Sequence, residues 1–296
     1  MTIKTSGSSS GLSSDRLDRI GLTLLTLTVA LPMAWSAGYA LLYSVGGIGH
    51  LSTGWSWRYW QGALSTGGLR SSLWYSPTLA AASTLAALVV SLIFVVFFPT
   101  ARHSRSFQAI LTIPLATPAA VTAFLVYQWL NPGGFASRLL HRLNLVESPA
   151  DFPILVMDEW SIGILVAQLW STTPLFLLYC FKTWEHARVD RFRAVAEALG
   201  ASPWSSRLSI ALPMLARRVR GLAILTFLAN LGAYEIPLLL GRQAPQMFSV
   251  LAQRRFTQFD LEQRPQAFAL ASVYLTLVSV GLAFALLRSR RDGQSS

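Results

Sequence analysis

The stretch "AEALGASPWSSRLSIALP", residues 196–213, mixes polar and apolar residues in a chain whose neighbouring segments are mostly apolar. Helical spacing predicts a first helix that ends within this stretch, with four residues on one apolar face: Phe192, Val195, Ala196 and Leu199. Gly200 follows, at the position just after a helix where a left-handed backbone conformation is common and a side chain is unfavourable. The pattern predicts a helix and a sharp turn.

A second helix is predicted directly after this turn. Ser202 fits its N-cap and Pro203 its first turn. Its apolar side is formed by Trp204, Leu208, Ala211 and Leu212. Because Pro213 has no backbone N–H, we expect a kink or an end there. Such a structured connection is longer than ordinary helix–helix connections and favours a docking element. An amphipathic helix on the lipid headgroups is the alternative.

The composition of the whole chain indicates a membrane protein. Of its 296 residues 53% are hydrophobic and 12% are charged, and the mean hydropathy is +0.47. Soluble domains carry about twice that charged fraction. The single cysteine, Cys180, lies in an apolar run and excludes an internal disulfide, and no Cys and His cluster has the spacing of metal ligands.

Six segments are long and apolar enough to cross a bilayer as helices, which predicts an all-α polytopic membrane protein. Pro114 and Pro118 are expected only to bend the third of them. The predicted spans are Ile20–Val45, Tyr75–Phe98, Phe107–Leu130, Ser161–Phe181, Gly221–Gly241 and Ala267–Leu287.

The distribution of charge predicts the orientation of these spans. With six spans both termini lie on one side, and that side holds two thirds of the 24 Lys and Arg residues. Because cytoplasmic loops collect basic residues, both termini and the helix–turn–helix stretch are expected to be cytoplasmic. Membrane topology thus accounts for most of the net charge of +11, and no nucleic-acid partner is expected.

The predicted organisation is simple. Residues 1–19 are polar and rich in Ser and Gly, so they are predicted to be a disordered cytoplasmic N-terminus. Residues 20–290 form the transmembrane domain, with a cytoplasmic loop at about 185–213, and residues 291–296 form a cytoplasmic tail.

The cytoplasmic loop resembles a known motif. Gly200, followed after nine residues by Ile210 and then by Leu212-Pro213, is similar to the EAA loop of permease subunits in binding-protein-dependent ABC importers. The first part of that motif, Glu-Ala-Ala, is replaced here by Ala194, Val195 and Ala196. Glu197 lies about one turn later and is the candidate to replace the missing acid.

The resemblance implies a type I ABC importer permease fold in a cell inner membrane and a coupling loop that docks on ATPase subunits. The "GAYEIPLLLG" string resembles the polyamine, thiamine and ferric-iron group of these permeases. The implied partners are two ATPase subunits, a second permease chain (similar or identical) and an extracytoplasmic solute-binding protein. The implied docking residues are Ala194, Ala196, Glu197, Ala198, Gly200, Ala201, Ser202, Trp204, Ile210, Leu212 and Pro213.

Polar residues inside the predicted spans are candidates for the solute pathway. An ionisable residue such as Glu235 inside a membrane span is a functional candidate by default, and an acid near the external surface is the alternative. Hydrogen bonding between helices is the commoner use of the uncharged ones. The candidate set is Glu235, Asn230, Tyr234, Gln168 and Thr172.

The chain is not expected to be an enzyme. It has no G-x-x-x-x-G-K-[ST] nucleotide-binding loop, so it should bind no cofactor, and ATP and Mg²⁺ are expected in the partner ATPase subunits. Two other functions remain open from the sequence: an ion-coupled secondary transporter that uses Glu235, and a non-transporting membrane scaffold.

Overall fold

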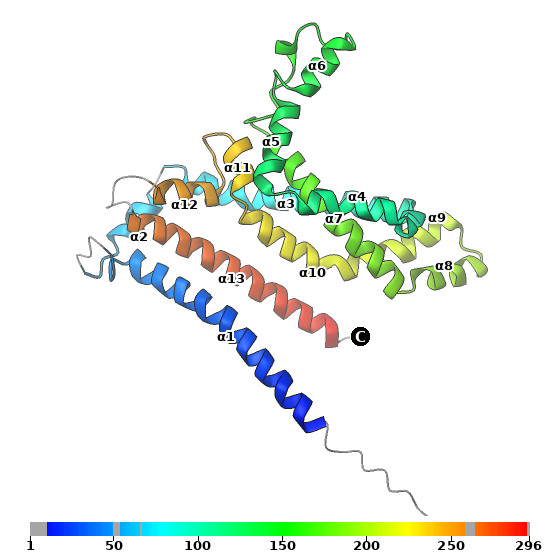
Figure 1. Cartoon of the computed structure of the whole chain (residues 1–296), viewed down its shortest axis with the longest axis horizontal. Coiled ribbons are helices and arrows are strands. Elements are labelled where there is room, and N and C mark those ends of the chain that lie inside the picture. The colour runs from blue at the N-terminus through cyan, green and yellow to red at the C-terminus, as the bar shows by residue number, and fades with distance from the viewer. Residues whose placement is uncertain (1–10, 50–53, 66, 258–263, 295–296) are drawn as a thin grey trace, which may run out of the picture. The chain divides into compact units, whose positions relative to one another are not determined.

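The computed structural model describes residues 11–49, 54–65, 67–257 and 264–294. Throughout this part of the chain every regular element is a helix (Figure 1). The contacts divide the chain into two compact units, one of residues 1–64 and 255–275 and the other of residues 65–254 and 276–296. Each unit is described separately.

The first unit contains α1 (Gly11–Ser44), α2 (Arg58–Leu64) and the first part of α13 (Arg264–Gln294). Aromatic rings hold it together, with the Tyr43 and Phe268 ring centroids 4.4 Å apart. The Trp60 indole donates a hydrogen bond to the Ser44 hydroxyl (3.2 Å). The apolar side chains of α1 are largely exposed, as expected for a helix whose surface contacts lipid.

The ends of the chain differ from the sequence prediction. Because α1 begins at Gly11, residues 11–19 of the predicted disordered segment are helical, while residues 1–10 lie outside the described residues. At the other end α13 continues to Gln294, so residues 291–294 extend the last helix instead of forming a separate tail.

Three helices, α3 (Leu69–Phe97), α7 (Ile162–His186) and α10 (Leu212–Leu231), pack side by side as the centre of the second unit. Apolar side chains fill the space between them, among them the fully buried Phe176 and Trp184. The Ser91 hydroxyl of α3 donates to the Thr173 carbonyl of α7 (3.2 Å), which fixes the register of these two helices.

Four helices are long and apolar enough to cross a membrane: Asp18–Ser44, Leu69–Phe97, Ile162–His186 and Arg264–Ala283. A fifth candidate is a bent pair, α4 (Arg105–Ala116) followed by α5 (Ala119–Leu130). The part Arg105–Ala116 meets the part Ala119–Arg142 at 99°, so the bend expected at the prolines is present and is sharp enough to divide the predicted span into two helices. The residue before a proline avoids the helical region, and Thr117 is extended (ψ 124°) before Pro118.

The predicted span Gly221–Gly241 is also broken. The helix α10 ends at Leu231, and the short helix α11 (Glu235–Leu240) begins after residues 232–234. The Ser249 hydroxyl donates to the Ala233 carbonyl in this break (2.5 Å), replacing part of the lost helical bonding. Within the described residues, neither α10 nor α11 is long and apolar enough to cross a membrane. The structure therefore supports four or five crossings, and the predicted count of six is not confirmed.

The remaining helices of the second unit are short and connect the longer ones. Two of them, α8 (Val189–Ala198) and α9 (Pro203–Ser206), join α7 to α10 through the π-helical turn η3 (Arg207–Ala211), and they carry the candidate site. The other connecting elements are η1 (Pro99–His103), α6 (Phe135–Arg142), η2 (Pro149–Asp151) and α12 (Phe248–Phe256, whose last two residues fall in the first unit).

Candidate functional site: a two-helix unit between α7 and α10

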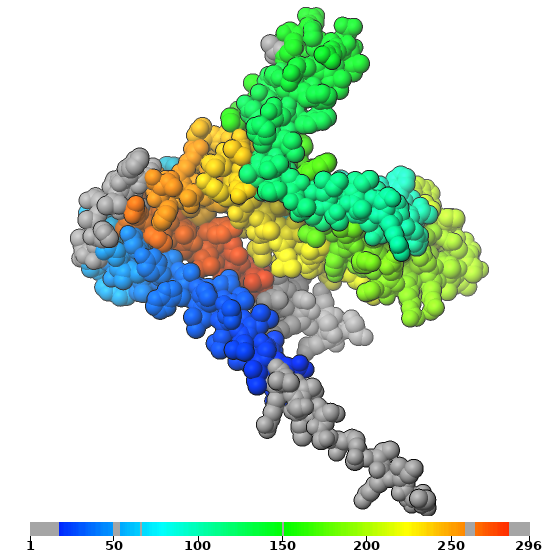
Figure 2. Space-filling model, viewed as in Figure 1, coloured from blue at the N-terminus to red at the C-terminus, as the bar shows by residue number. Residues whose placement is uncertain are grey.

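The predicted helix–turn–helix is present in the structure. It consists of α8 (Val189–Ala198), α9 (Pro203–Ser206) and η3 (Arg207–Ala211), which runs directly into α10. These elements lie together at the end of α7, and their yellow-green surface is open at the edge of the second unit (Figures 1 and 2). We call them the docking unit.

The turn of the docking unit depends on Gly200. Its backbone is left-handed, with φ +94°, as predicted from the sequence. The N–H of Gly200 donates to the Glu197 carbonyl (3.1 Å), and the N–H of Ala201 donates to the Ala196 carbonyl (2.9 Å). This pair of bonds satisfies carbonyls that the end of α8 would otherwise leave free.

The start of α9 is fixed by the predicted cap. Ser202 is extended (ψ 153°), and its hydroxyl accepts a hydrogen bond from the N–H of Ser205 (3.1 Å). Pro203 occupies the first helical turn, where its missing N–H leaves no bond unmade. Both predictions are confirmed.

The predicted end or kink at Pro213 takes a different form. The helix does not stop there, because η3 continues into α10. The N–H of Leu212 donates to the Arg207 carbonyl, five residues back instead of four. In a regular α-helix the Pro213 ring would collide with the Ser209 carbonyl. The extra residue in the π turn moves this carbonyl away from the proline ring and so avoids the collision.

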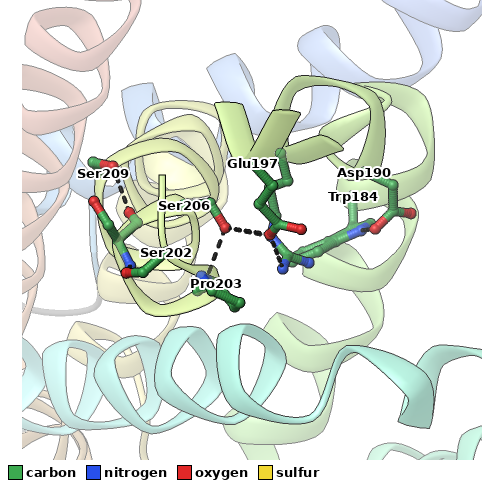
Figure 3. A network of polar contacts seen from close by, with 9 residues as sticks. Trp184, Asp190, Glu197, Ser202, Pro203, Ser206 and Ser209 are labelled. Carbon is green, nitrogen blue, oxygen red and sulfur yellow. Dashed lines mark hydrogen bonds and ion pairs between the residues drawn. The ribbon is translucent and has the colours of Figure 1, made fainter. Parts of the chain in front are cut away.

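Glu197 joins the two helices of the docking unit. The Ser206 hydroxyl donates to its carboxylate (2.6 Å), and the Arg193 guanidinium pairs with the same oxygen (3.0 Å). Figure 3 shows Glu197 pointing toward Ser206 across the turn, while Trp184 and Asp190 form a second contact nearby.

These partners stabilise the ionised form of Glu197. The hydrogen bond from Ser206, and then the nearby Arg193, lower the pKa of Glu197 below its usual value. A depressed pKa means that the contact contributes its full stability above the ordinary glutamate pKa of about 4.3 and loses it only as the pH falls through the lowered value. The link between α8 and α9 is therefore intact at neutral pH.

The apolar side of α8 faces outward. Asp190, Arg193 and Glu197 contact other parts of the second unit and Val189 is buried, whereas Phe192, Val195 and Leu199 are exposed. Together with two residues of α9 and η3 they form an exposed surface, the docking face, in which each side chain is between 49% and 84% exposed: Phe192, Val195, Leu199, Trp204 and Leu208.

The predicted docking residues separate into two groups. Most are exposed on the unit: Ala194, Glu197, Ala198, Gly200, Ser202 and Trp204. The others are partly covered: Ala196, Ala201, Ile210, Leu212 and Pro213. Leu212 packs against the core of α3, α7 and α10, so it anchors the unit instead of presenting a surface.

The predicted docking set omitted four residues of the docking face and the polar residues that hold the unit. The helical periodicity of Phe192, Val195 and Leu199 identified one apolar face but did not show whether it points inward or outward. Ser206 and Asp190 have no sequence signal, because their partners are set by tertiary structure.

The predicted pathway residues lie on three elements of the second unit, α7, α10 and the start of α11. Asn230 is buried, and its amide donates to Ser83 Oγ (3.3 Å) and Thr84 Oγ1 (3.1 Å), so it joins α10 to α3. Glu235 is exposed and Tyr234 is partly exposed, both at the break before α11.

The other two pathway candidates lie on α7. The Thr172 hydroxyl donates to the Gln168 carbonyl one turn earlier (2.7 Å). The Gln168 side chain is buried, and its amide has no hydrogen-bond partner in the described part of the chain. A buried amide of this kind costs free energy unless a partner appears in another state.

A chain of several apolar helices long enough to cross a membrane, with an exposed two-helix unit between two of its central helices, fits the class of transport permeases. Known proteins agree with this class. The molybdenum transport system permease protein ModB of Azotobacter vinelandii is 27% identical over 215 residues, which cover 70% of this chain and 90% of that protein. No protein-family model matches the chain.

Two further comparisons point the same way. The sulfate transport system permease protein CysT of Escherichia coli (strain K12) is 27% identical over 62% of each chain. In fold, the chain is similar to a solved bacterial ABC transporter involved in the import of the acidic polysaccharide alginate, with a TM-score of 0.65 and 17% identity over 95% of this chain and 98% of the other.

The function predicted from the EAA-like loop is thereby confirmed. This chain is a transmembrane permease subunit of an ABC importer, and the comparisons favour this function over an ion-coupled secondary transporter. The relatives are permease subunits and not enzymes.

Proposed function

We propose that the docking face is the surface through which this permease is driven by ATP-hydrolysing subunits. The observation that carries the proposal is an exposed apolar strip at α8: Phe192, Val195 and Leu199 are exposed, while Arg193 and Glu197 bond to Ser206 of α9. A helix on a soluble surface has the opposite arrangement, so an apolar face of this size calls for a protein partner.

The construction of the unit supports the same proposal. A surface that transmits movement has to be stiff, and here the turn at Gly200, the cap at Ser202 and the Glu197–Ser206 bond each restrict α8 relative to α9. Glu197 would then take the place of the acid that the EAA motif has at its first position. ATP and Mg²⁺ would be held by the two partner subunits and no cofactor by this chain.

The experiment is a change of polarity on the docking face. We expect Leu199→Asp to abolish co-purification of the ATPase subunits while the permease still inserts, because a carboxylate would be buried against an apolar partner surface. Leu145→Asp is the matched control: Leu145 is also exposed and apolar (69%) but lies outside the docking unit. Normal assembly of the Leu199→Asp protein would refute docking at this face.

We further propose an assembly around a pair of permease chains, similar or identical, in a cell inner membrane. One solved structure with the same fold is of a bacterial alginate ABC transporter in complex with an alginate pentasaccharide-bound periplasmic protein, with a TM-score of 0.66 and 18% identity. This supports an extracytoplasmic solute-binding protein as a partner here. Six crossings with both termini in the cytoplasm complete the proposal.

Glu235 would influence whether the permease favours cationic or anionic solutes. If the importer serves the polyamine, thiamine and ferric-iron group, an exposed acid at the break before α11 would favour cationic solutes by about 1 kcal/mol at contact in water. The relatives named for sulfate and the importer of an acidic polysaccharide suggest anionic solutes instead, which the same acid would disfavour.

Glu235→Gln separates these two cases because it removes the charge and keeps the shape. Uptake of labelled spermidine and of labelled sulfate should be compared in vesicles at low salt, where screening is weakest. Slower spermidine uptake supports the cationic group, and faster sulfate uptake supports an anionic solute. Unchanged uptake of whichever probe is transported would place Glu235 outside the pathway.

A further inference from the structure

The loop between α3 and α4 is tied to the docking unit by an ion pair. Arg102 of η1 places Nη2 2.8 Å from Asp190 Oδ2 in the first turn of α8. The Arg102 side chain is only 11% exposed, and its Nη1 donates to the Pro99 carbonyl (2.8 Å). The Gln108 amide in turn donates to the Arg102 carbonyl. The guanidinium is therefore held in place by its own loop before it meets Asp190.

Trp184, fully buried at the end of α7, completes this contact. Its indole N–H donates to the second oxygen of Asp190 (3.0 Å), as Figure 3 shows. The Arg102 guanidinium lies over the Trp184 ring at 5.3 Å from the ring centroid, in the range of a cation–π contact. We call Arg102, Trp184 and Asp190 the clamp.

A second contact lies beside the clamp. The Phe97 ring, at the end of α3, meets the Trp204 ring of α9 edge to face, with centroids 4.9 Å apart. Thus α8 contacts η1 through the Arg102–Asp190 pair, and α9 contacts the last residue of α3 through the Phe97 and Trp204 rings. All of these residues belong to the second unit of the chain.

The connectivity shows why these contacts matter. The docking unit is covalently continuous with α7 at one end and with α10 at the other. It has no covalent path to α3 and α4 except through the length of α7. A force on the docking face would reach α7 and α10 through the continuous backbone. It would reach α3 and α4 directly only through side-chain contacts.

We propose that Arg102 is a positioning residue that makes η1, and with it the ends of α3 and α4, move as one body with the docking unit during the ATP cycle. The proposal rests on the docking function above and adds the route by which force enters the α3–α4 pair. Two features fit this role: a nearly buried guanidinium bonded to its own loop, and a carboxylate whose two oxygens are used by different helices.

The first test measures a distance and needs no solute. Spin labels are placed at the exposed Ser106 and Arg191 after the buried Cys180 is replaced by alanine, in the complex reconstituted in nanodiscs. The probe is ATP with vanadate. We expect the same label-to-label distance with and without the trap in the wild type, and a distance that broadens or shifts on trapping in Arg102→Met. A distance that changes on trapping in the wild type would overturn the proposal.

The second test asks whether the two charges act together. Arg102→Met and Asp190→Asn should each lower the ATPase stimulation given by the binding protein several-fold while basal hydrolysis stays, and the double variant should be no worse than either single one. Lys182→Met is the control, since Lys182 forms only an exposed pair with Glu185 at 3.9 Å. Additive losses in the double variant would show that the charges act separately and would refute the clamp.

The two proposals can fail independently. If Leu199→Asp leaves assembly intact, docking at the exposed apolar face is wrong, but the Ser106–Arg191 distance in the complex, with and without trapping, still reports on the clamp. If assembly is lost in Leu199→Asp and the two labels separate in the wild type on trapping, docking stands and the clamp falls. Arg102→Lys, which keeps the charge, should restore most of the stimulation only if the ion pair is what matters.

Discussion

At the residue scale, Gly200 decides whether the two helices of the docking unit can meet. Its φ of +94° lies where residues with a Cβ are strained, and a Cβ built there meets no atom within 4 Å. Gly200→Ala therefore tests backbone strain alone, without a steric clash. We expect a loss of about 1–2 kcal/mol, measured as a lower thermal midpoint of the purified permease and weaker retention of the ATPase subunits.

Gly221→Ala is the matched control for this change. Gly221 lies within α10, a Cβ there also meets nothing within 4 Å, and its φ is ordinary. An alanine in the middle of a helix should stabilise by about 0.5–1 kcal/mol. The same chemical change is thus expected to have opposite signs at the two positions. Equal effects would mean that the left-handed turn at Gly200 carries no strain for alanine.

At the scale of elements, the sequence predicts what local backbone chemistry controls. The positive φ of Gly200 and the cap at Ser202 follow from the preferences of single residues, and both are confirmed. The 99° bend between α4 and α5 and the break after Leu231 are not predicted by hydropathy, because an apolar run reads the same whether the helix within it is straight or interrupted.

Contacts between distant elements are beyond what a single sequence indicates. The Arg102–Asp190 pair joins residues 88 positions apart, and no spacing rule connects them. The direction of the apolar face of α8 is of the same kind: periodicity predicts the face, but only the exposure of Phe192, Val195 and Leu199 in the structure shows that it points outward.

The π turn between α9 and α10 gives a prediction at this scale. Pro213→Ala restores a backbone donor at position 213 and removes the collision with the Ser209 carbonyl. The turn should then relax to α-helical bonding, which rotates α9 relative to α10 and pulls Trp204 from Phe97. We expect slower amide exchange across residues 207–213 and reduced ATPase stimulation.

Pro203→Ala serves as the comparison, because a proline in the first turn replaces no helical bond and its loss should change neither quantity. If Pro213→Ala leaves both amide exchange and stimulation unchanged, side-chain contacts such as Glu197–Ser206 hold the π turn, and the proline only tolerates it.

At the scale of the whole molecule, the number of crossings depends on a single helix pair. The four uninterrupted candidates and the bent pair α4–α5 give five crossings if all of them span. An odd number would put the two termini on opposite sides of the membrane. The six-span prediction, which puts two thirds of the Lys and Arg residues on the side of both termini and the docking unit, needs an even number. In that prediction the broken pair α10 and α11 supplies the sixth crossing.

Single cysteines decide this directly, because among the described elements between the docking unit and the C-terminus only α10–α11 and α13 are long enough to cross, α12 having nine residues. If α10–α11 crosses, cysteines at Ser202 and at Ser295, which lies outside the described residues, should react from the same side. If the pair dips in and returns, α13 alone crosses, and the two positions should react from opposite sides. A cysteine at Ser148 is the internal standard: α7 separates it from Ser202, so it should label from the external side in either case. Labelling of intact cells with a membrane-impermeant maleimide, before and after permeabilisation, gives the answer.

A broken helix can cross a bilayer only where its free backbone groups are covered by protein or water, and the bond from Ser249 to the Ala233 carbonyl already covers one of them. We therefore expect Ser202 and Ser295 to label together after permeabilisation, which would make the break between α10 and α11 an interruption within a sixth span.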